Sequence, residues 1–443
     1  NGNSADELDI QYFKGEISID SPAAQLDEII STLRSRQEWL SRQPIEGLAA
    51  IIGKVAEIWL KDRRYDFLRD KGRLFLSQWC SERHLLQMAK EGLRGNIAYA
   101  DGFNPFADSD SHYLKANPRG LVCHWMAGNV QILGMFALVQ AIITKNANLI
   151  KVAAKDGGVF SGLMQAFEEV EVTLPDNSVL KGADVASSVA VVYFPRTSEK
   201  IAELMSKSAD VRVAWGGKEA VATVAGYPSK IDSQTVVFGP RLSMAVVGRE
   251  ALESEHDARK LARRLTVDVA VFDQYGCASP HNVYIENGGN ITPERFCEIL
   301  AEVFPKTELQ IPKGRMSVEE ISAIHSIRGV YDFKGKAYGS DTLSWTVLLD
   351  PEMTLEKPVY SRVLFVHTVD SIMDTLPYIE PYIQSVGIAA SINKAIQFAD
   401  VATAKGVERL PRIGRMLNFE MPWDGMFLID RLVRWNTLYG PTV

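Results

Sequence analysis

The chain has 443 residues, of which 46% are hydrophobic and 23% are charged, with 32 Gly and 19 Pro. This composition is ordinary for a globular protein, and the length predicts more than one domain. The formal net charge of −7 argues against the basic surface of a nucleic-acid-binding protein, so we expect no nucleic-acid partner.

The four cysteines, Cys80, Cys123, Cys277 and Cys297, are too few for a disulfide framework, and they form no C-x-x-C pair. We therefore expect no structural zinc site, and free thiols suit a reducing compartment. The first residues are polar and acidic, unlike a signal peptide. The most apolar stretch, 130–143, contains two glutamines and is too short to span a bilayer. These features predict a cytoplasmic protein without a membrane span.

The first ninety or so residues are expected to be mostly helical. Apolar side chains recur there at helical spacing in three stretches, 24–42, 45–61 and 74–91. Leu26, Ile29, Ile30 and Leu33 illustrate the pattern in the first stretch, and Pro44 separates the first stretch from the second.

From about residue 118, short β-rich runs alternate with helical stretches. The runs are 121–123, 149–152, 189–193 and 211–214. This alternation predicts βαβ units and a parallel sheet. Glycines stand at several strand-to-helix junctions, at the carboxyl ends of the strands, where open sheets bind nucleotides. A second α/β region follows the boundary at 238–241, with a polar helix at 252–265 and a strand at 282–286.

Cys277 is the strongest candidate for a nucleophile. Gly276 and Ala278 flank it and Pro280 ends any helix, so we expect the thiol in a turn before a strand, open to a substrate. A nucleophilic cysteine needs this access together with thiolate character. The alternative is an inert buried thiol, because free cysteine is among the most buried residue types. The surroundings of the other three cysteines predict packing roles.

Two further candidates follow predicted strands. Asn129 lies between a strand and a helix, where a side-chain amide could donate a hydrogen bond to a developing oxyanion. The alternative is a plain helix N-cap. Lys151 ends an apolar strand, from which a lysine can reach a ribose hydroxyl or a phosphate. The alternative is an edge lysine that points into water.

The segment Trp215-Gly216-Gly217 opens a helix. Paired glycines allow a ligand to approach the backbone, and helix N–H groups can face a phosphate. The segment is neither G-x-G-x-x-G nor a P-loop. The seven histidines do not cluster and show no metal-ligand spacing, so we expect no metal site.

Several segments, taken in order, resemble the aldehyde dehydrogenase superfamily, and within it the bacterial acyl-CoA reductases of the LuxC type, the fatty acid reductases of bioluminescence. The resemblance covers about residues 95–435. It rests on Gly128-Asn129-Val130, 146–151, Trp215-Gly216-Gly217, Asp273-Gln274-x-x-Cys277-x-Ser279-Pro280, 360–365, and 406–409 through 423–425. The cysteine segment and the tail are its most specific parts.

The resemblance implies an aldehyde dehydrogenase-like α/β fold, with an open, mostly parallel cofactor-binding sheet, a second α/β catalytic domain and a helical N-terminal segment. The expected domains are 1–95, packing on the cofactor domain; 96–240, with a return of about 400–443, for cofactor binding; and 241–399, which carries Cys277. Members commonly form dimers or tetramers, so the resemblance also implies a homo-oligomer.

The catalytic roles that the resemblance implies centre on Cys277 as the acyl-accepting nucleophile. Asn129 and the Cys277 backbone N–H would form the oxyanion hole. Oxidising members carry a glutamate that activates water, but the corresponding stretch here, 238–241, has no carboxylate. A thioester reductase needs no such base, because the hemithioacetal collapses to an aldehyde without water. The missing glutamate therefore favours reduction.

The cofactor roles fall on the first sheet. Lys151 would hold the adenosine ribose, and Trp215, Gly216 and Gly217 would line the cofactor. NAD-preferring relatives have an acidic residue where this chain has Ala154, which Lys155 follows, so nothing there repels a 2′-phosphate. This favours NADPH, with NADH as the alternative. The glutamate that binds the nicotinamide ribose in the superfamily has its place near Pro358, so that contact is in doubt.

The expected function is NADPH-dependent reduction of an acyl thioester to an aldehyde through an acyl-Cys277 intermediate. The substrate would be a fatty acyl-CoA or an acyl-carrier thioester, and an acyl-transferring partner enzyme could deliver it. Two alternatives stay open. One is an aldehyde-oxidising dehydrogenase that uses NAD(P), and the other is a cysteine acyltransferase or thioesterase without nicotinamide.

Overall fold

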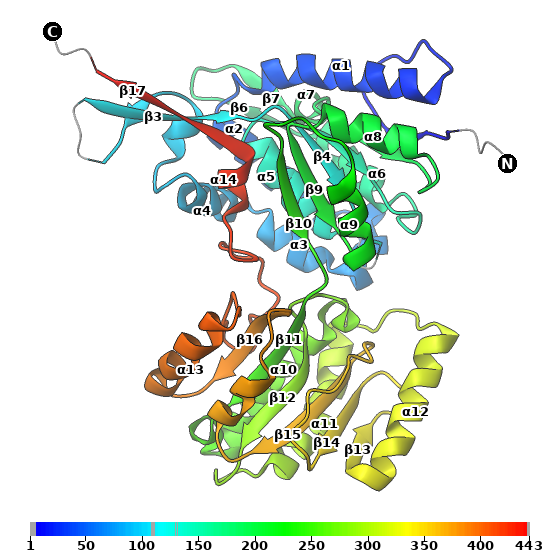
Figure 1. The fold of residues 1–443 in the computed structure, drawn as a ribbon, viewed down its shortest axis with the longest axis vertical. Coiled ribbons are helices and arrows are strands. Elements are labelled where there is room, and N and C mark those ends of the chain that lie inside the picture. The colour runs from blue at the N-terminus through cyan, green and yellow to red at the C-terminus, as the bar shows by residue number, and fades with distance from the viewer. Residues whose placement is uncertain (1–5, 108–110, 129, 131, 441–443) are drawn as a thin grey trace. The chain divides into compact units, whose positions relative to one another are not determined.

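The computed structural model describes residues 6–107, 111–128, 130 and 132–440. The chain divides into two compact units, which Figure 1 draws with their elements labelled. Unit 1 consists of Asn1–Gly239, Phe419–Pro422 and Met426–Val443, and unit 2 consists of Pro240–Asn418 and Trp423–Gly425. Each unit contains a six-stranded sheet whose strands are mostly parallel. The predicted α/β class is therefore confirmed.

The main sheet of unit 1 has the order β1-β8-β5-β4-β9-β10, and all neighbours pair in parallel except β1 with β8. The strands are β1 (Asp9–Tyr12), β4 (Leu121–Trp125), β5 (Ala147–Lys151), β8 (Val189–Tyr193), β9 (Val211–Trp215) and β10 (Gln234–Phe238). Every residue of β4 and β9 is buried, which explains why these runs are mostly apolar instead of alternating. All four strands predicted for this region are present.

The first long helix, α1 (Pro22–Leu40), packs its apolar face on this sheet. Its buried residues Leu26, Ile29 and Leu33 share a core with residues of β4, β5 and β8. The stretch 74–91, expected as one helix, forms two instead, α3 (Arg73–Trp79) and α4 (Glu82–Gly92). The break follows from Ser81, which has extended backbone angles and stands at the N-cap of α4.

The remaining helices of unit 1 are short except for α2, and α5 is buried almost completely, as its apolar sequence predicts. The helices are α2 (Ile45–Lys61), α5 (Leu133–Ile143), α6 (Val159–Met164), α7 (Gly182–Ala186), α8 (Glu199–Ser208), α9 (Lys218–Gly226) and α14 (Leu428–Leu432), with 3-10 turns η1 (Arg63–Lys71), η2 (Ile97–Ala100) and η3 (Gln165–Glu169). Two small antiparallel sheets complete the unit. They are β17 (Val433–Tyr439), β3 (His112–Pro118) and β2 (Asn104–Pro105), and the pair β6 (Glu171–Thr173) and β7 (Val179–Lys181).

The sheet of unit 2 has the order β13-β14-β15-β12-β11-β16, and only β13 runs antiparallel to its neighbour. Its strands are β11 (Leu242–Val247), β12 (Pro280–Glu286), β13 (Lys336–Gly339), β14 (Thr346–Asp350), β15 (Val363–Val369) and β16 (Ile383–Ala389). The helices are α10 (Glu255–Ala270), α11 (Pro293–Gln310), α12 (Val318–Lys334) and α13 (Ile392–Ala404), with 3-10 turns η4 (Arg249–Leu252), η5 (Val271–Gln274) and η6 (Ile372–Tyr378).

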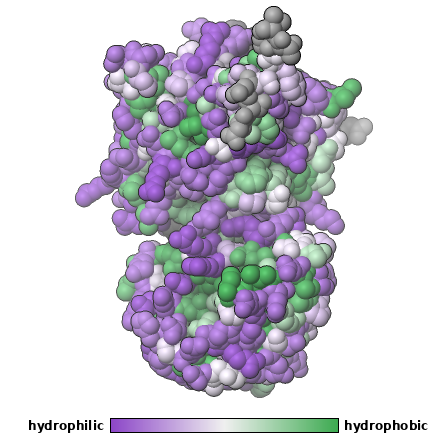
Figure 2. Space-filling model, turned by 90° about the vertical axis from the view of Figure 1, so that its left-hand side faces the viewer, coloured by the Kyte–Doolittle hydropathy of each residue, from purple (hydrophilic) through white to green (hydrophobic). Residues whose placement is uncertain are grey.

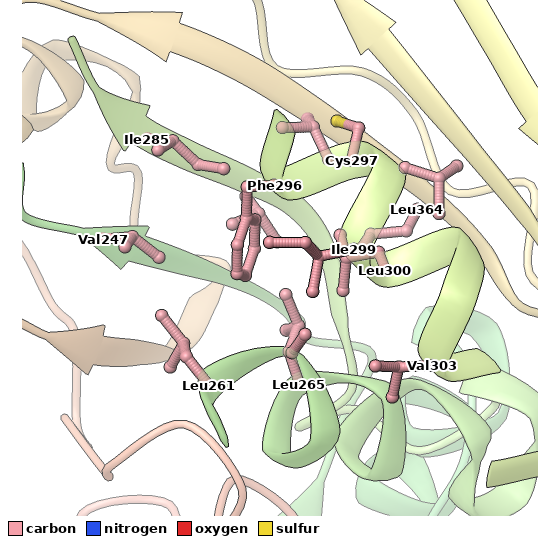
Figure 3. Close-up of a cluster of buried hydrophobic side chains, with 14 of the residues drawn as sticks. Val247, Leu261, Leu265, Ile285, Phe296, Cys297, Ile299, Leu300, Val303 and Leu364 are labelled. Carbon is pink, nitrogen blue, oxygen red and sulfur yellow. The ribbon is translucent and has the colours of Figure 1, made fainter. Parts of the chain in front are cut away.

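A large apolar core fills the space where α10 and α11 pack against this sheet. Figure 3 shows Leu261 and Leu265 of α10 and Phe296 of α11 pointing toward Val247 and Ile285 of the strands. Cys297 belongs to this core and is completely buried, which agrees with its predicted packing role. Because α10 and β12 both contribute to this core, the segment that joins them is anchored at both ends on a well-packed scaffold.

The chain re-enters unit 1 later than the sequence suggests. The expected return begins at about residue 400, but the structure groups 400–418 with unit 2. The reason is that this stretch pairs with the sheet of unit 2, because Arg409 and Arg412 form parallel bridges with Ser385 and Ile388 of β16. Residues 419–422 and 426–443 are the part that belongs to unit 1.

Figure 2 shows hydrophilic residues over most of the face in view, with hydrophobic residues in scattered groups. Within the described part of the chain, no helix combines the length and apolarity that crossing a membrane requires.

Candidate active site

Cys277 lies in the turn that connects α10 and η5 to β12, at the amino end of that strand. This is the location that the sequence predicts. Three consecutive residues before the turn, Phe272, Asp273 and Gln274, have left-handed backbone angles, with φ of 56°, 49° and 66°. Such angles are unfavourable for residues other than glycine, so the surrounding structure must hold this segment in place.

The main restraint is a buried ion pair. The guanidinium of Arg362 donates from Nε to Oδ1 of Asp273 at 2.6 Å, and Arg362 is only 1% exposed. The Gly314 N–H donates to Oδ2 of the same carboxylate at 3.0 Å, and the Ser361 N–H donates to the Asp273 carbonyl at 3.0 Å. Ser361 and Arg362 themselves have left-handed angles, as does Tyr360. The two segments with unfavourable backbone angles, 272–274 and 360–362, therefore stabilise each other.

One side-chain amide and one hydroxyl group fix the rest of the turn. The buried Gln274 side chain donates to the carbonyls of Pro280 and Val363, at 2.9 and 3.0 Å. The Ser243 hydroxyl, at the start of β11, donates to the Cys277 carbonyl at 2.8 Å. The peptide group after Cys277 is thus held against the amino end of β11, which fixes the position of the Cys277 backbone.

Cys277 is a half-buried residue, whereas Cys80, Cys123 and Cys297 are buried. Burial raises the pKa of Cys277 to about 12, and the negative charge of Asp424 adds to this rise. A hydrogen bond from the Gln384 side chain and the positive charge of Arg409 act in the opposite direction and lower the pKa. For the other three thiols burial also raises the pKa, but no side-chain hydrogen bond is among the causes.

Sequence reasoning misses Gln384, Arg409 and Asp424. Gln384 lies in β16, far from Cys277 in the sequence. The two residues come to the same edge of the sheet because β11 pairs with both β12 and β16. Arg409 and Asp424 fall within the tail segments of the resemblance, which was the available signal. His281, four residues after Cys277 in the chain, is buried against the ring of Tyr360, and burial lowers its pKa to about 4.

The second group of candidates lies at the carboxyl edge of the unit 1 sheet. The chain runs from β4 to β5 and β8 on one side, then returns to β9 and β10 on the other side of β4. The order reverses between β4 and β9, and open α/β sheets bind ligands at the carboxyl ends of the strands at such a switch point. Lys151 ends β5 and Trp215 ends β9, so both stand on this edge.

Lys151 is not an edge lysine in water, because β5 lies between β4 and β8. Its Nζ is 5.6 Å from the ring centre of Tyr193 and 5.5 Å from that of Phe194. Burial, and to a lesser extent Arg196, lower the pKa of Lys151. The half-buried ammonium thus stands among aromatic rings at the end of the sheet.

The segment Trp215-Gly216-Gly217 lies where β9 gives way to α9. Trp215 stacks on Phe238 with ring centres 3.9 Å apart, and its Nε1 has no hydrogen-bond partner among the described residues. Gly217 is the N-cap of α9, and a Cβ added there would meet open space. The first N–H groups of α9 are therefore not covered by a side chain at this position.

Asn129 lies outside the described residues, so the structure leaves its predicted role open. The helix that follows, α5, begins at Leu133 with Ile132 at its N-cap. Among the described residues, no group of three or more His, Cys, Asp and Glu side chains is placed to hold a metal ion.

Comparisons with known proteins identify the family of this chain and its relatives. A model of the family "Acyl-CoA reductase (LuxC)" matches residues 25–435. The long-chain acyl-protein thioester reductase of Aliivibrio fischeri is 27% identical over 361 residues, which cover 80% of this chain and 71% of that protein.

Solved structures show the same fold. An NAD-dependent benzaldehyde dehydrogenase from Corynebacterium glutamicum superposes with a TM-score of 0.63 at 14% identity, over 98% of this chain and 96% of that one. A glyceraldehyde-3-phosphate dehydrogenase from Methanocaldococcus jannaschii, complexed with NADP, superposes with a TM-score of 0.63 at 13% identity, over 96% of this chain and 95% of that one. The aldehyde dehydrogenase-like fold predicted from sequence is therefore confirmed.

Proposed function

Because the chain belongs to the acyl-CoA reductase (LuxC) family, and is therefore an enzyme that reduces an acyl thioester to an aldehyde, we propose that its reaction runs through a thioester on Cys277. The observation that carries this proposal is the turn before β12. It holds Cys277, a half-buried residue, at the amino end of a strand, whereas the other three cysteines are buried. A nucleophile needs both that access and that fixed position.

The first step forms the acyl-enzyme. The Cys277 sulfur attacks the thioester carbon, its S–C bond forms, and the bond to the donor sulfur breaks, so the thiol proton ends on the departing thiol. The Cys277 N–H and the side chain of Asn129 are our candidates for stabilising the oxyanion. Since Ser243 fixes the Cys277 carbonyl, the turn presents its own backbone in one orientation.

The second step is reduction. NADPH, when bound, supplies a hydride to the acyl carbon. The resulting hemithioacetal oxyanion on Cys277 re-forms its C=O bond, and the C–S bond breaks with its electron pair going to sulfur. Aldehyde leaves, and the thiolate takes up a proton. No water is needed, so this step requires no base at 238–241, where the chain has no carboxylate.

We assign cofactor binding to the carboxyl edge of the unit 1 sheet. Lys151 would hold the adenosine ribose, and Trp215, Gly216 and Gly217 would line the site. The open space at Gly217 and the indole N–H of Trp215, which has no hydrogen-bond partner in the described part of the chain, are compatible with a ligand there. We prefer NADPH to NADH because Ala154 is exposed at the position that would face the ribose 2′-group and carries no negative charge.

The substrate is proposed to be a fatty acyl thioester. The relative from Aliivibrio fischeri is named for long-chain acyl groups attached to a protein, and we extend the chain length, but not the carrier, to this chain. Coenzyme A and a protein thiol are the two donors to compare. A homo-oligomer and an acyl-transferring partner enzyme stay predictions.

A second candidate function is aldehyde oxidation, which one observation favours. Oxidation needs a carboxylate to activate water, and Asp424 is near enough to Cys277 to raise its pKa. Burial raises the pKa of Asp424 itself to about 6, so it is able to accept a proton near neutral pH. Acid formed from an aldehyde faster than aldehyde from a thioester would establish this alternative.

The experiment that tests the proposed function is trapping of the acyl-enzyme. Incubation with a long-chain acyl-CoA in the absence of nicotinamide should leave one acyl group on the peptide that contains Cys277, detected by mass spectrometry. Cys277→Ala should carry none and should lose turnover. Cys297→Ala, a cysteine from the core of the same unit, is the matched control and should be acylated normally. Full turnover by Cys277→Ala would refute the mechanism.

A further inference from the structure

Tyr275 stands directly before the tight turn that carries Cys277. The Ser279 N–H donates to the Gly276 carbonyl at 3.0 Å, so residues 276–279 form a turn with Cys277 at its second position. Gly276 is the one residue between Tyr275 and Cys277, and glycine restrains its own backbone less than any other residue. The direction in which Cys277 points therefore depends on how the residue before that glycine is held.

Tyr275 is held at its backbone, its ring and its hydroxyl. The N–H donates to the Phe272 carbonyl at 2.8 Å. The ring stacks on the ring of Tyr360, with ring centres 5.1 Å apart and planes 2° from parallel. The hydroxyl donates to Oε1 of Glu320. Replacing tyrosine by phenylalanine removes the hydroxyl and leaves the other two contacts, so the contact with Glu320 can be tested by itself.

Glu320 lies in the first turn of α12, which fixes its carboxylate. The Ser317 N–H donates to Oε2 at 2.6 Å, and the Ser317 hydroxyl accepts from the Glu320 N–H at 3.2 Å, which is a capping box. One turn further along the helix, Ile324 is completely buried in a core with residues of β14 and β15. The other carboxylate oxygen, Oε1, accepts from Tyr275 and, at 2.7 Å, from the Ser361 hydroxyl. Glu320 therefore ties a packed helix to the segment before the nucleophile.

The hydrogen bonds also keep this carboxylate charged. Burial acts to raise the pKa of Glu320, but the hydrogen bonds from Ser317, Ser361 and Tyr275 outweigh it and lower the pKa. A hydrogen bond from a hydroxyl to a charged acceptor is about twice as strong as one between neutral groups. The anchor at Tyr275 is thus a strong one.

We propose that Glu320 is a positioning residue for acyl transfer to Cys277 and that it acts through the Tyr275 hydroxyl. This inference rests on the proposed function of Cys277 and deepens it. Asp273 and Arg362 hold the left-handed segment before Tyr275, and Glu320 holds Tyr275 itself. Together they keep the turn in the orientation in which the sulfur meets the thioester carbon.

Two reactions of the same thiol separate positioning from reactivity. Attack on a thioester needs a defined approach of sulfur to carbon, and a displacement of about 1 Å costs about 100-fold in rate. Alkylation by iodoacetamide, a small reagent that has no binding site to be aligned with, depends on the thiolate and its exposure. Loss of a positioning contact should therefore slow the first reaction and spare the second.

Acyl transfer to Cys277 is measured in a single turnover with saturating long-chain acyl-CoA and no nicotinamide, and alkylation is measured on the same proteins. Tyr275→Phe removes the donor, and Glu320→Ala removes the acceptor. Each should slow acyl transfer about 10- to 100-fold and leave alkylation within about twofold of the native rate. Tyr275→Phe keeps the stacked ring and serves if Glu320→Ala does not fold.

Glu319→Ala is the matched control, because Glu319 is an exposed carboxylate in the same first turn of α12. Both of its rates should equal the native ones. The double variant, Tyr275→Phe with Glu320→Ala, tests whether the two residues act as a unit. It should transfer the acyl group no more slowly than the slower single variant.

Native acyl transfer in Tyr275→Phe would overturn the inference. So would a change in alkylation as large as the change in acyl transfer, because the effect would then be on the thiol itself, and so would single effects that multiply in the double variant. The proposed function fails separately, if Cys277→Ala keeps its turnover. An enzyme that needs Cys277 but transfers acyl groups normally without the Tyr275 hydroxyl would retain its nucleophile and lose only this assignment.

Discussion

Replacing Arg362 by methionine should destabilise unit 2 and release the turn that carries Cys277. The Arg362 side chain is 2% exposed and its Nε lies 2.6 Å from the Asp273 carboxylate. Removing one partner of a buried ion pair costs about 3 to 5 kcal/mol, because the other charge is left without compensation. Asp273 keeps the Gly314 N–H at 3.0 Å and its side chain is 18% exposed, so we expect the lower end, about 3 kcal/mol.

The assay is hydrogen exchange read peptide by peptide, because two units need not unfold together. Amides of β12 and β15 should exchange about 100-fold faster in Arg362→Met, which corresponds to about 3 kcal/mol. Lys207→Met is the control, since Lys207 pairs with Glu203 on an exposed helix face, where a pair contributes about 0.5 kcal/mol or less. If β12 exchanged at the same rate in both variants, the Asp273–Arg362 pair would not be what holds the turn.

Three more outcomes follow. Ala154→Asp should lower the ratio of kcat/KM for NADPH over NADH about tenfold, by repelling a 2′-phosphate, and an unchanged ratio would contradict the assignment of this position. Lys151→Met should raise the KM for the nicotinamide cofactor about tenfold and leave acyl transfer to Cys277 in the absence of cofactor unchanged, because Lys151 is proposed to act only by holding the cofactor. Asp268 is buried and its pKa is raised to about 7, so its contribution to stability is full below about pH 4 and falls as the pH rises to 7. The stability deficit of Asp268→Asn, measured by urea unfolding, should therefore shrink by about 2 to 3 kcal/mol between about pH 5 and about pH 8, and a constant deficit would refute this.

The sheet of unit 1 could be predicted from sequence because its strands are buried on both faces. Such strands are short apolar runs, as in β4 and β8, and the helices between them have a different period. The helix boundary at Ser81 could not be predicted, because the stretch 74–91 keeps helical spacing of its apolar residues on both sides of the break. The tail was placed too early in unit 1, because bridges such as Ser385 to Arg409 pair residues far apart in the chain.

The candidate site, like the fold, could be predicted only where the signal is local in the sequence. Cys277 has a local signature of glycine, small residues and proline, and the structure places it in the expected turn. The groups around its sulfur have no such signature. Gln384 approaches the thiol only because β16 and β12 both pair with β11, and Arg362 meets Asp273 across the same sheet edge. Sequence reasoning identifies the candidate nucleophile but not the side chains that hold its turn in place.

The central claim, reduction of an acyl thioester through Cys277, is tested most directly by following NADPH consumption and aldehyde release with a series of acyl-CoAs from short to long. The account predicts equal amounts of NADPH consumed and aldehyde formed, a preference for long chains, and no turnover by Cys277→Ala. Aldehyde formation that persists in Cys277→Ala, or NADPH consumption without aldehyde, would contradict it.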